Sequence, residues 1–106
     1  MSIKSSRSKD KNSLEISIEG PFDFNVLSDF REAYLDNIND ETQKPYADYI
    51  VNLRATSSID SSALGMLLNM KRTLDKNDKE IQITQCRPQI KKILIISRFD
   101  KKFSIS

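Results

Sequence analysis

Three consecutive side chains, Asp60, Ser61 and Ser62, form the part of this sequence with the clearest capacity for chemistry. They follow a strand-like segment at residues 50–53 and a polar turn, and they precede an apolar run that is typical of a helix. The first N–H groups of a helix have no partners within the helix, and the positive end of the helix dipole lies there, so that a phosphate is favoured. The sequence therefore predicts two serine hydroxyls at a helix N-terminus, in a position that favours a phosphate.

The alternative for these side chains is simple helix capping. Ser, Thr, Asp and Asn are preferred at the N-cap because their side-chain oxygens accept hydrogen bonds from free backbone N–H groups. Asp60, Ser61 or Ser62 fits that position by residue type and spacing. Periodicity alone favours capping, because caps are far more common than phosphorylation sites.

The composition of the 106-residue chain excludes several other kinds of chemistry. The chain has no histidine, and therefore lacks the commonest general base and the commonest metal ligand. Its single cysteine, Cys86, excludes an internal disulfide and agrees with a reducing, cytoplasmic setting. A hydrophobic content of 38% and a charged content of 30% suit one soluble globular domain. We expect a single domain over residues 1–106, with no metal or cofactor of its own.

The charge pattern bears on the possible partners. Seventeen basic and 15 acidic side chains are distributed along the chain, with a formal net charge of +2. Nucleic-acid binding requires a concentrated basic face, whereas the lysine doublets at 91–92 and 101–102 are interpreted as solvated faces. No apolar run approaches the ~20 residues that span a bilayer, and residues 2–12 are too polar for a signal peptide. We therefore expect a cytoplasmic protein with no nucleic-acid partner and no direct membrane insertion.

Hydrophobic periodicity in the first half of the chain predicts the elements that precede the serines. Alternation at 14–18 predicts a strand that Gly20 and Pro21 end, with residues 3–8 as an edge strand paired in a hairpin. Apolar residues three and four positions apart predict a helix over about residues 24–38, which Asp23 or Asn25 caps. The sequence thus indicates a β-hairpin followed by a helix.

The second half of the chain alternates strands and helices. We expect a buried strand at 49–53, a polar loop at 54–60, a helix at about 62–76 and a strand around 81–83. A third helix begins at Pro88 and places Ile90, Ile93 and Leu94 inward, and residues 103–106 form a short final strand. The order β-β-α-β-α-β-α-β predicts an α/β fold with a small mixed β-sheet of four to five strands and about three to four helices. In such a fold the loop after a central parallel strand is a favoured place for function.

Residues 59–68, with the sequence Ile-Asp-Ser-Ser-Ala-Leu-Gly-Met-Leu-Leu, resemble the signature of the anti-sigma factor antagonists of the STAS family. The family pattern consists, in order, of a hydrophobic residue, Asp, Ser, a position that is either Ser or Thr, and then Gly, Leu and Gly, followed by an apolar helix. In this sequence Ala63 stands where the first Gly of the pattern is usual. Chain length, element order, the strand at 50–53 and the Cys86-Arg87-Pro88 segment also look like the family. The resemblance therefore covers nearly the whole chain and implies a single STAS domain.

The resemblance implies a bacterial protein switch and not an enzyme. In such antagonists the serine after the Asp is phosphorylated by a serine kinase of the GHKL ATPase type, often the anti-sigma factor itself, and a PP2C-type phosphatase removes the phosphate. By position the acceptor is Ser61, with Ser62 as the minor alternative, and ATP and metal belong to the partners. A second possibility is a subunit of a membrane lipid ABC transport complex, since stand-alone STAS proteins also serve lipid-transport ATPases.

The apolar arc of the second predicted helix is wider than a helix on a sheet requires. It covers roughly 200°, whereas one buried face needs about 100°. Either the flanking helices bury the surplus, or part of the arc, with a flexible methionine, is an exposed patch beside Ser61. The residues expected to contact a partner are Asp60, Ser61, Ser62, Ala63, Leu64, Gly65, Met66 and Met70.

Overall fold

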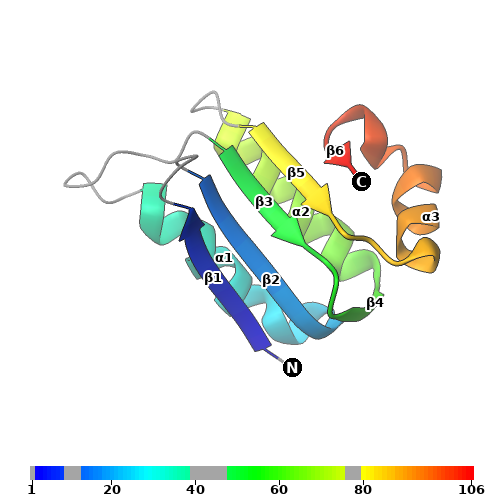
Figure 1. Cartoon of the computed structure of the whole chain (residues 1–106), viewed down its shortest axis with the longest axis horizontal. Coiled ribbons are helices and arrows are strands. Elements are labelled where there is room, and N and C mark those ends of the chain that lie inside the picture. The colour runs from blue at the N-terminus through cyan, green and yellow to red at the C-terminus, as the bar shows by residue number, and fades with distance from the viewer. Residues whose placement is uncertain (1, 9–12, 39–47, 76–79) are drawn as a thin grey trace.

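A mixed β-sheet organises the fold (Figure 1). The computed structural model describes residues 2–8, 13–38, 48–75 and 80–106. Strands β1 and β2 form an antiparallel hairpin, and β3, β5 and β6 follow in parallel in the order β1-β2-β3-β5-β6. The short strand β4 pairs in parallel with the end of β2. The bounds are β1 Ser2–Ser8, β2 Ser13–Phe22, β3 Asp48–Asn52, β4 Thr56–Ile59, β5 Glu80–Thr84 and β6 Ser104–Ile105.

The helices lie mainly on one face of this sheet. Figure 1 shows α1 and α2 behind the strands, whereas α3 lies at the β6 end. The opposite face carries polar side chains, among which Asn52 Nδ2 donates a hydrogen bond to Glu15 Oε1 at 3.1 Å. The α/β fold class is therefore confirmed, as a two-layer arrangement. The helical bounds are η1 Phe24–Val26, α1 Leu27–Ile38, α2 Ser61–Asp75, α3 Pro88–Ile96 and η2 Phe99–Lys101, where η denotes a 3-10 helix.

The core lies between the sheet and α1 and α2. Leu14, Ile16 and Ile18 are buried along β2, as their alternation predicts. Phe30 on α1 packs between two aromatic rings, with ring centroids 5.2 Å from Phe22 and 5.6 Å from Tyr34. These contacts join α1 to the end of β2, and so hold the segment that follows β2 in place.

Two predictions about the middle of the sheet are wrong. Gly20 and Pro21 do not end β2, which continues to Phe22, and residues 54–60 are not simply a loop, because they contain β4. Gly20 has a φ of 85°, a left-handed conformation that glycine adopts without strain, and the β2–β4 register shifts between Gly20 and Pro21. This bulge accommodates the proline, and the Gly20 N–H donates to the Ala55 carbonyl at 3.0 Å.

The third helix begins at Pro88 as predicted, but the prediction for one residue of its inner face is wrong. Ile90 and Leu94 are buried, whereas Ile93 is exposed. The short helix η2 and the final strand β6 follow it, and Phe99 and Phe103 stack in the core with ring centroids 5.4 Å apart. These two rings hold the C-terminal segment against the rest of the fold.

Candidate functional site

The candidate site lies where β2 and β4 end and α2 begins. The register pairs Phe22 with Ile59, so that residues 23–25 and the Asp60-Ser61 segment leave neighbouring strand ends. Thr56 Oγ1 donates a hydrogen bond to the buried Ile18 carbonyl at 2.8 Å, which fastens β4 to β2. The strand pairing therefore places the start of α2 beside the segment after β2.

Asp60 is the residue that caps α2. Its Oδ1 accepts a hydrogen bond from the Ala63 N–H at 3.0 Å, and its carbonyl accepts one from the Leu64 N–H at 3.3 Å. Ser61 is the first residue of α2 and is exposed, whereas Ser62 is half-buried. Because Asp60 provides the cap, the Ser61 hydroxyl is not required for it, and it stands at the surface beside the free N–H groups of the first turn.

Removal of this cap gives a direct test of the local structure. We expect Asp60→Ala to lower the free energy of unfolding by about 1 kcal/mol, because the first turn of α2 loses its side-chain acceptor. Asp60→Asn keeps an oxygen in the same place and should retain most of the stability. Urea unfolding of both variants measures the difference, and equal stability of the alanine and asparagine variants would contradict the capping assignment.

The segment after β2 contributes an exposed aromatic ring that the sequence interpretation missed. Asp23 Oδ1 accepts a hydrogen bond from the Asn25 N–H at 2.9 Å, which confirms Asp23 as the cap of η1. Phe24 is 68% exposed at the surface. The available signal in the sequence is that Phe24 precedes the apolar stripe of α1 and does not belong to it.

Two guanidinium groups lie at the same carboxyl edge of the sheet, after β3 and β5. Arg54 and Arg87 are both exposed, and Arg87 Nε donates to the Arg54 carbonyl at 3.4 Å. The Arg54 N–H in turn donates to Asn52 Oδ1 at 2.9 Å, which shapes the turn between β3 and β4. This edge of the sheet thus combines the carboxylates of Asp23 and Asp60 with two cations.

The structure separates the residues expected to contact a partner into two groups. Asp60, Ser61 and Gly65 are exposed, and Ser62 and Leu64 are half-buried. The others, Ala63, Met66 and Met70, are buried, so that for these three residues the structure favours burial over the alternative of an exposed patch.

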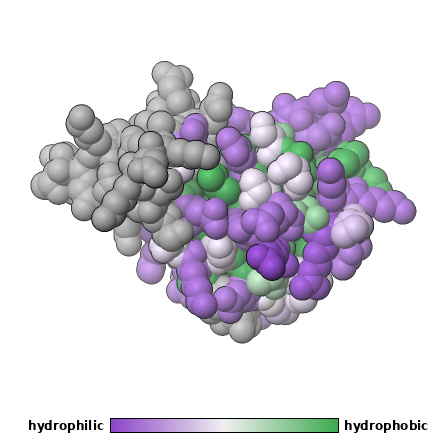
Figure 2. All heavy atoms as spheres, in the orientation of Figure 1, coloured by the Kyte–Doolittle hydropathy of each residue, from purple (hydrophilic) through white to green (hydrophobic). Residues whose placement is uncertain are grey.

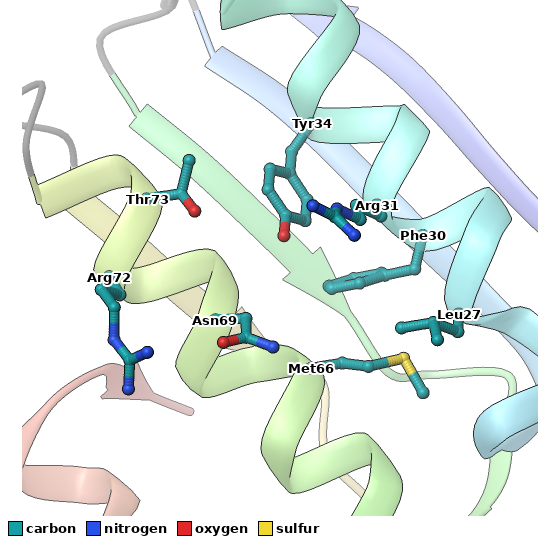
Figure 3. A pocket seen from close by; sticks show the side chains of 8 residues that line it. All are labelled: Leu27, Phe30, Arg31, Tyr34, Met66, Asn69, Arg72 and Thr73. Atoms are coloured by element: carbon teal, nitrogen blue, oxygen red, sulfur yellow. The ribbon is translucent and has the colours of Figure 1, made fainter.

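The surplus apolar arc of α2 is buried by its neighbours. Met66 lies across a cavity from Leu27 and Phe30 of α1 (Figure 3). On the other side, the Lys71 ammonium lies 5.9 Å from the ring centroid of Phe103 in the C-terminal segment. A Cβ added at Gly65 would meet no atom within 4 Å, so packing within this chain does not require a glycine there.

The cavity between α1 and α2 begins about one helical turn beyond Ser61 along α2. Its volume is about 190 Å³, and Figure 3 shows Arg31 beside Tyr34 and Phe30 on α1, with Arg72 on α2 at the opposite side. Burial raises the pKa of Tyr34, which lines it, and the charge of Arg31 opposes that rise. The full lining is Leu27, Phe30, Arg31, Tyr34, Met66, Asn69, Arg72 and Thr73.

The lone thiol offers no ready nucleophile at neutral pH. Burial raises the pKa of Cys86, and the neighbouring Lys91 charge opposes the rise only in part. A protonated thiol is a poor nucleophile. Within the described ranges no cluster of three or more His, Cys, Asp or Glu side chains suits a metal ion. The described helices are also too short or too polar for any of them to cross a membrane.

Comparison with solved structures places this architecture in the STAS fold. The Bacillus anti-sigma factor antagonist SpoIIAA matches in its unphosphorylated form with a TM-score of 0.75 and 18% identity, over 99% of this chain and 87% of that chain. Its phosphorylated form matches with a TM-score of 0.73, 18% identity and coverages of 99% and 91%. A putative anti-sigma factor antagonist from Thermotoga maritima has a TM-score of 0.82 at 15% identity, over 97% and 84% of the two chains.

Sequence comparison defines the family. The family model described as "Mlab, STAS domain" matches residues 5–105, and a STAS-domain containing protein of Pseudomonas aeruginosa is 39% identical over the full length of both chains. The chain therefore belongs to the STAS domain family.

Proposed function

We propose that this chain is a cytoplasmic anti-sigma factor antagonist. In this proposal it binds a serine-kinase-type anti-sigma factor or a similar regulator while Ser61 is unphosphorylated, and phosphorylation of Ser61 releases the partner. The observation that carries the proposal is that Ser61 is exposed at the first position of α2, beside an Asp60 that provides the cap. The chain acts as the substrate of a GHKL-type kinase and a PP2C-type phosphatase, and is not itself a catalyst.

The local electrostatics favour a switch that acts on the partner and leaves the fold intact. A phosphate on Ser61 adds about −1.5 to −2 charge at neutral pH. The N-terminus of α2 stabilises that charge, whereas the carboxylate of Asp60 repels it, so that the two effects partly cancel. A docked partner instead meets a new charge within its interface, and a change of even ~1.4 kcal/mol alters affinity tenfold.

The accessible surface around Ser61 defines the proposed docking edge, which consists of Phe24, Asn25, Asp60, Ser61 and Gly65. All five are exposed; four of them follow the ends of two paired strands, and Gly65 lies one turn further along α2. Phe24 supplies the large apolar side chain that interfaces commonly use as an anchor. Gly65, one turn into α2, leaves open space at which a partner backbone can lie close to the helix.

Phosphorylation in vitro tests the switch. Incubation with ATP and its cognate GHKL-type kinase should place phosphate on Ser61, and Ser61→Ala should abolish it. Ser57→Ala, which alters another exposed serine on β4, is the matched control and should leave phosphorylation unchanged. Ser61→Asp should weaken binding of the same kinase about tenfold without a change in thermal unfolding. Phosphate on Ser57 or Ser62, or full affinity of the Asp variant, would contradict the proposal.

A second candidate is a subunit of a lipid ABC transport complex, and the match to the Mlab family model favours it. In that case the docking edge would bind the transport ATPase permanently. Affinity purification of the chain from its own cells separates the two functions. Stoichiometric recovery of a transport ATPase, with no phosphate on Ser61, supports transport. Recovery of a kinase with the wild-type chain, but not with Ser61→Asp, supports the switch.

A further inference from the structure

The nine-residue helix α3 exposes more aliphatic surface than its packing requires. Of the four large hydrophobic side chains that are exposed among the described residues, three lie on it: Ile93 at 39%, Ile95 at 46% and Ile96 at 71%. Helical geometry directs Lys92, Ile95 and Ile96 away from the face that buries Ile90 and Leu94. Figure 2 shows apolar atoms over α3 at the right-hand edge, bordered by hydrophilic side chains.

The same end of the molecule concentrates positive charge. Residues 86–106 hold one acidic side chain, Asp100, whereas the whole chain has a net charge of only +2. Arg98, with a φ of 62°, ends the turn after α3, and η2 packs back against α3, so that the two lysine doublets lie on neighbouring elements (Figure 1). The basic residues of this segment are Arg87, Lys91, Lys92, Arg98, Lys101 and Lys102.

We propose that this end of the fold binds the headgroup region of an anionic lipid bilayer. The α3 surface consists of Lys91, Lys92, Ile95 and Ile96, all of which are exposed on one side of the helix, and the exposed Lys101 and Lys102 add positive charge on the neighbouring η2 segment. Lysines beside a membrane surface are attracted by anionic headgroups, and aliphatic side chains on the same face enter the boundary between headgroups and acyl chains. The bound state is peripheral and reversible, because a few isoleucines and lysines provide far less affinity than a spanning segment.

The composition of the α3 surface distinguishes lipid from the other large anions. Lysine is depleted at protein–protein interfaces, which instead favour aromatic residues, methionine and arginine. Single-stranded nucleic acids stack their bases on aromatic rings, and both aromatic rings of this segment, Phe99 and Phe103, are buried against each other. Isoleucine surrounded by lysine matches an anionic lipid surface better than either alternative.

Vesicle binding tests the inference. Full-length protein is mixed with vesicles of phosphatidylcholine that contain about 30 mol% phosphatidylglycerol, or none, at about 0.1 M NaCl, and the bound fraction is measured by flotation. We expect binding to the anionic vesicles, loss of that binding at high salt, and no binding to pure phosphatidylcholine. Ser61→Ala should bind the vesicles as the wild type does, because Ser61 belongs to the docking edge and not to the α3 surface.

Charge reversal on α3 supplies the most specific variant. Lys91→Glu/Lys92→Glu should lower the partition coefficient by more than about 30-fold, because loss of two attractive charges alone accounts for that factor and their reversal adds repulsion. Lys4→Glu/Arg31→Glu, at two exposed sites on β1 and α1, changes the net charge equally and is the matched control. The control should stay within about twofold of wild type if the location of the charge matters more than the total.

Removal of the aliphatic contribution is the complementary variant. Ile95→Asn/Ile96→Asn should lower binding about tenfold at unchanged charge, whereas Phe24→Asn removes an exposed ring elsewhere and should have no effect. Circular dichroism checks that every variant remains folded. Absence of wild-type binding to anionic vesicles, or equal losses in the α3 and control variants, would overturn the proposal. If the wild type does not bind vesicles and the α3 variants bind a protein partner more weakly, the α3 surface is a protein interface instead.

Discussion

Replacement of Phe30 with alanine should lower the free energy of unfolding by about 3–5 kcal/mol, the largest loss of stability that we expect from one substitution. Phe30 is 1% exposed and packs against Phe22 and Tyr34. It also forms part of the floor of the cavity between α1 and α2, so truncation enlarges an existing void that the surrounding rings cannot close. Small domains are stable by only about 5–15 kcal/mol, and the variant should be partly unfolded near physiological temperature.

Urea and thermal unfolding measure this effect. Phe30→Leu, which fills part of the same volume, should cost clearly less than the alanine variant. Phe24→Ala removes an equally large ring from the surface and should change stability by no more than about 0.5 kcal/mol. If Phe30→Ala and Phe24→Ala have the same stability, Phe30 does not hold α1 to the end of β2 as the ring contacts indicate.

Phe24→Ala should instead weaken partner binding by about 2 kcal/mol, or about 30-fold. The ring is 68% exposed in the free chain and follows the strand end that pairs with β4, beside Asp60 and Ser61. A large aromatic side chain that a partner desolvates is the usual form of an interface anchor, because it buries much area with few rotatable bonds. The loss should appear mainly as faster dissociation.

Isothermal titration with the same GHKL-type kinase checks this expectation. Ser28→Ala, at an exposed position on α1 outside the docking edge, and Ile96→Ala, an exposed apolar residue on α3, should both leave the affinity nearly unchanged. If Phe24→Ala binds the kinase with wild-type affinity, Phe24 is not part of the docking edge. A loss for Ile96→Ala alone would move the protein interface to the α3 surface.

Local signals predicted most of the elements because those elements depend on neighbours in sequence. The alternation around Ile16, the stripe that contains Phe30 and the proline at position 88 each identified an element that the structure contains. The strand β4 was missed because its four residues, Thr-Ser-Ser-Ile, carry little hydrophobic pattern and it forms through pairing with distant β2. The bulge at Gly20 depends on that same pairing, so the sequence interpretation placed the end of β2 too early.

Side-chain exposure at the site required the packed structure. Residue types and spacing identified the Asp60-Ser61-Ser62 segment and its place at a helix N-terminus, because capping and helical periodicity are local properties. They left open which residue caps the helix, and the hydrogen bond between Asp60 and Ala63 decides it. Met66 and Met70 lie on a face that periodicity alone cannot assign to core or solvent, and contacts with distant segments bury both.

The sequence by itself determined the fold class, the absence of histidine chemistry and the serine pair at the start of α2, because composition and short-range periodicity encode them. Tertiary structure alone decided that the segments that carry Phe24 and Ser61 follow neighbouring strand ends, and that two separate lysine doublets and the isoleucines of α3 lie at one end of the molecule. The physical reason is that surfaces form from segments brought together by strand pairing and packing, and local sequence patterns carry no record of which segments will be neighbours.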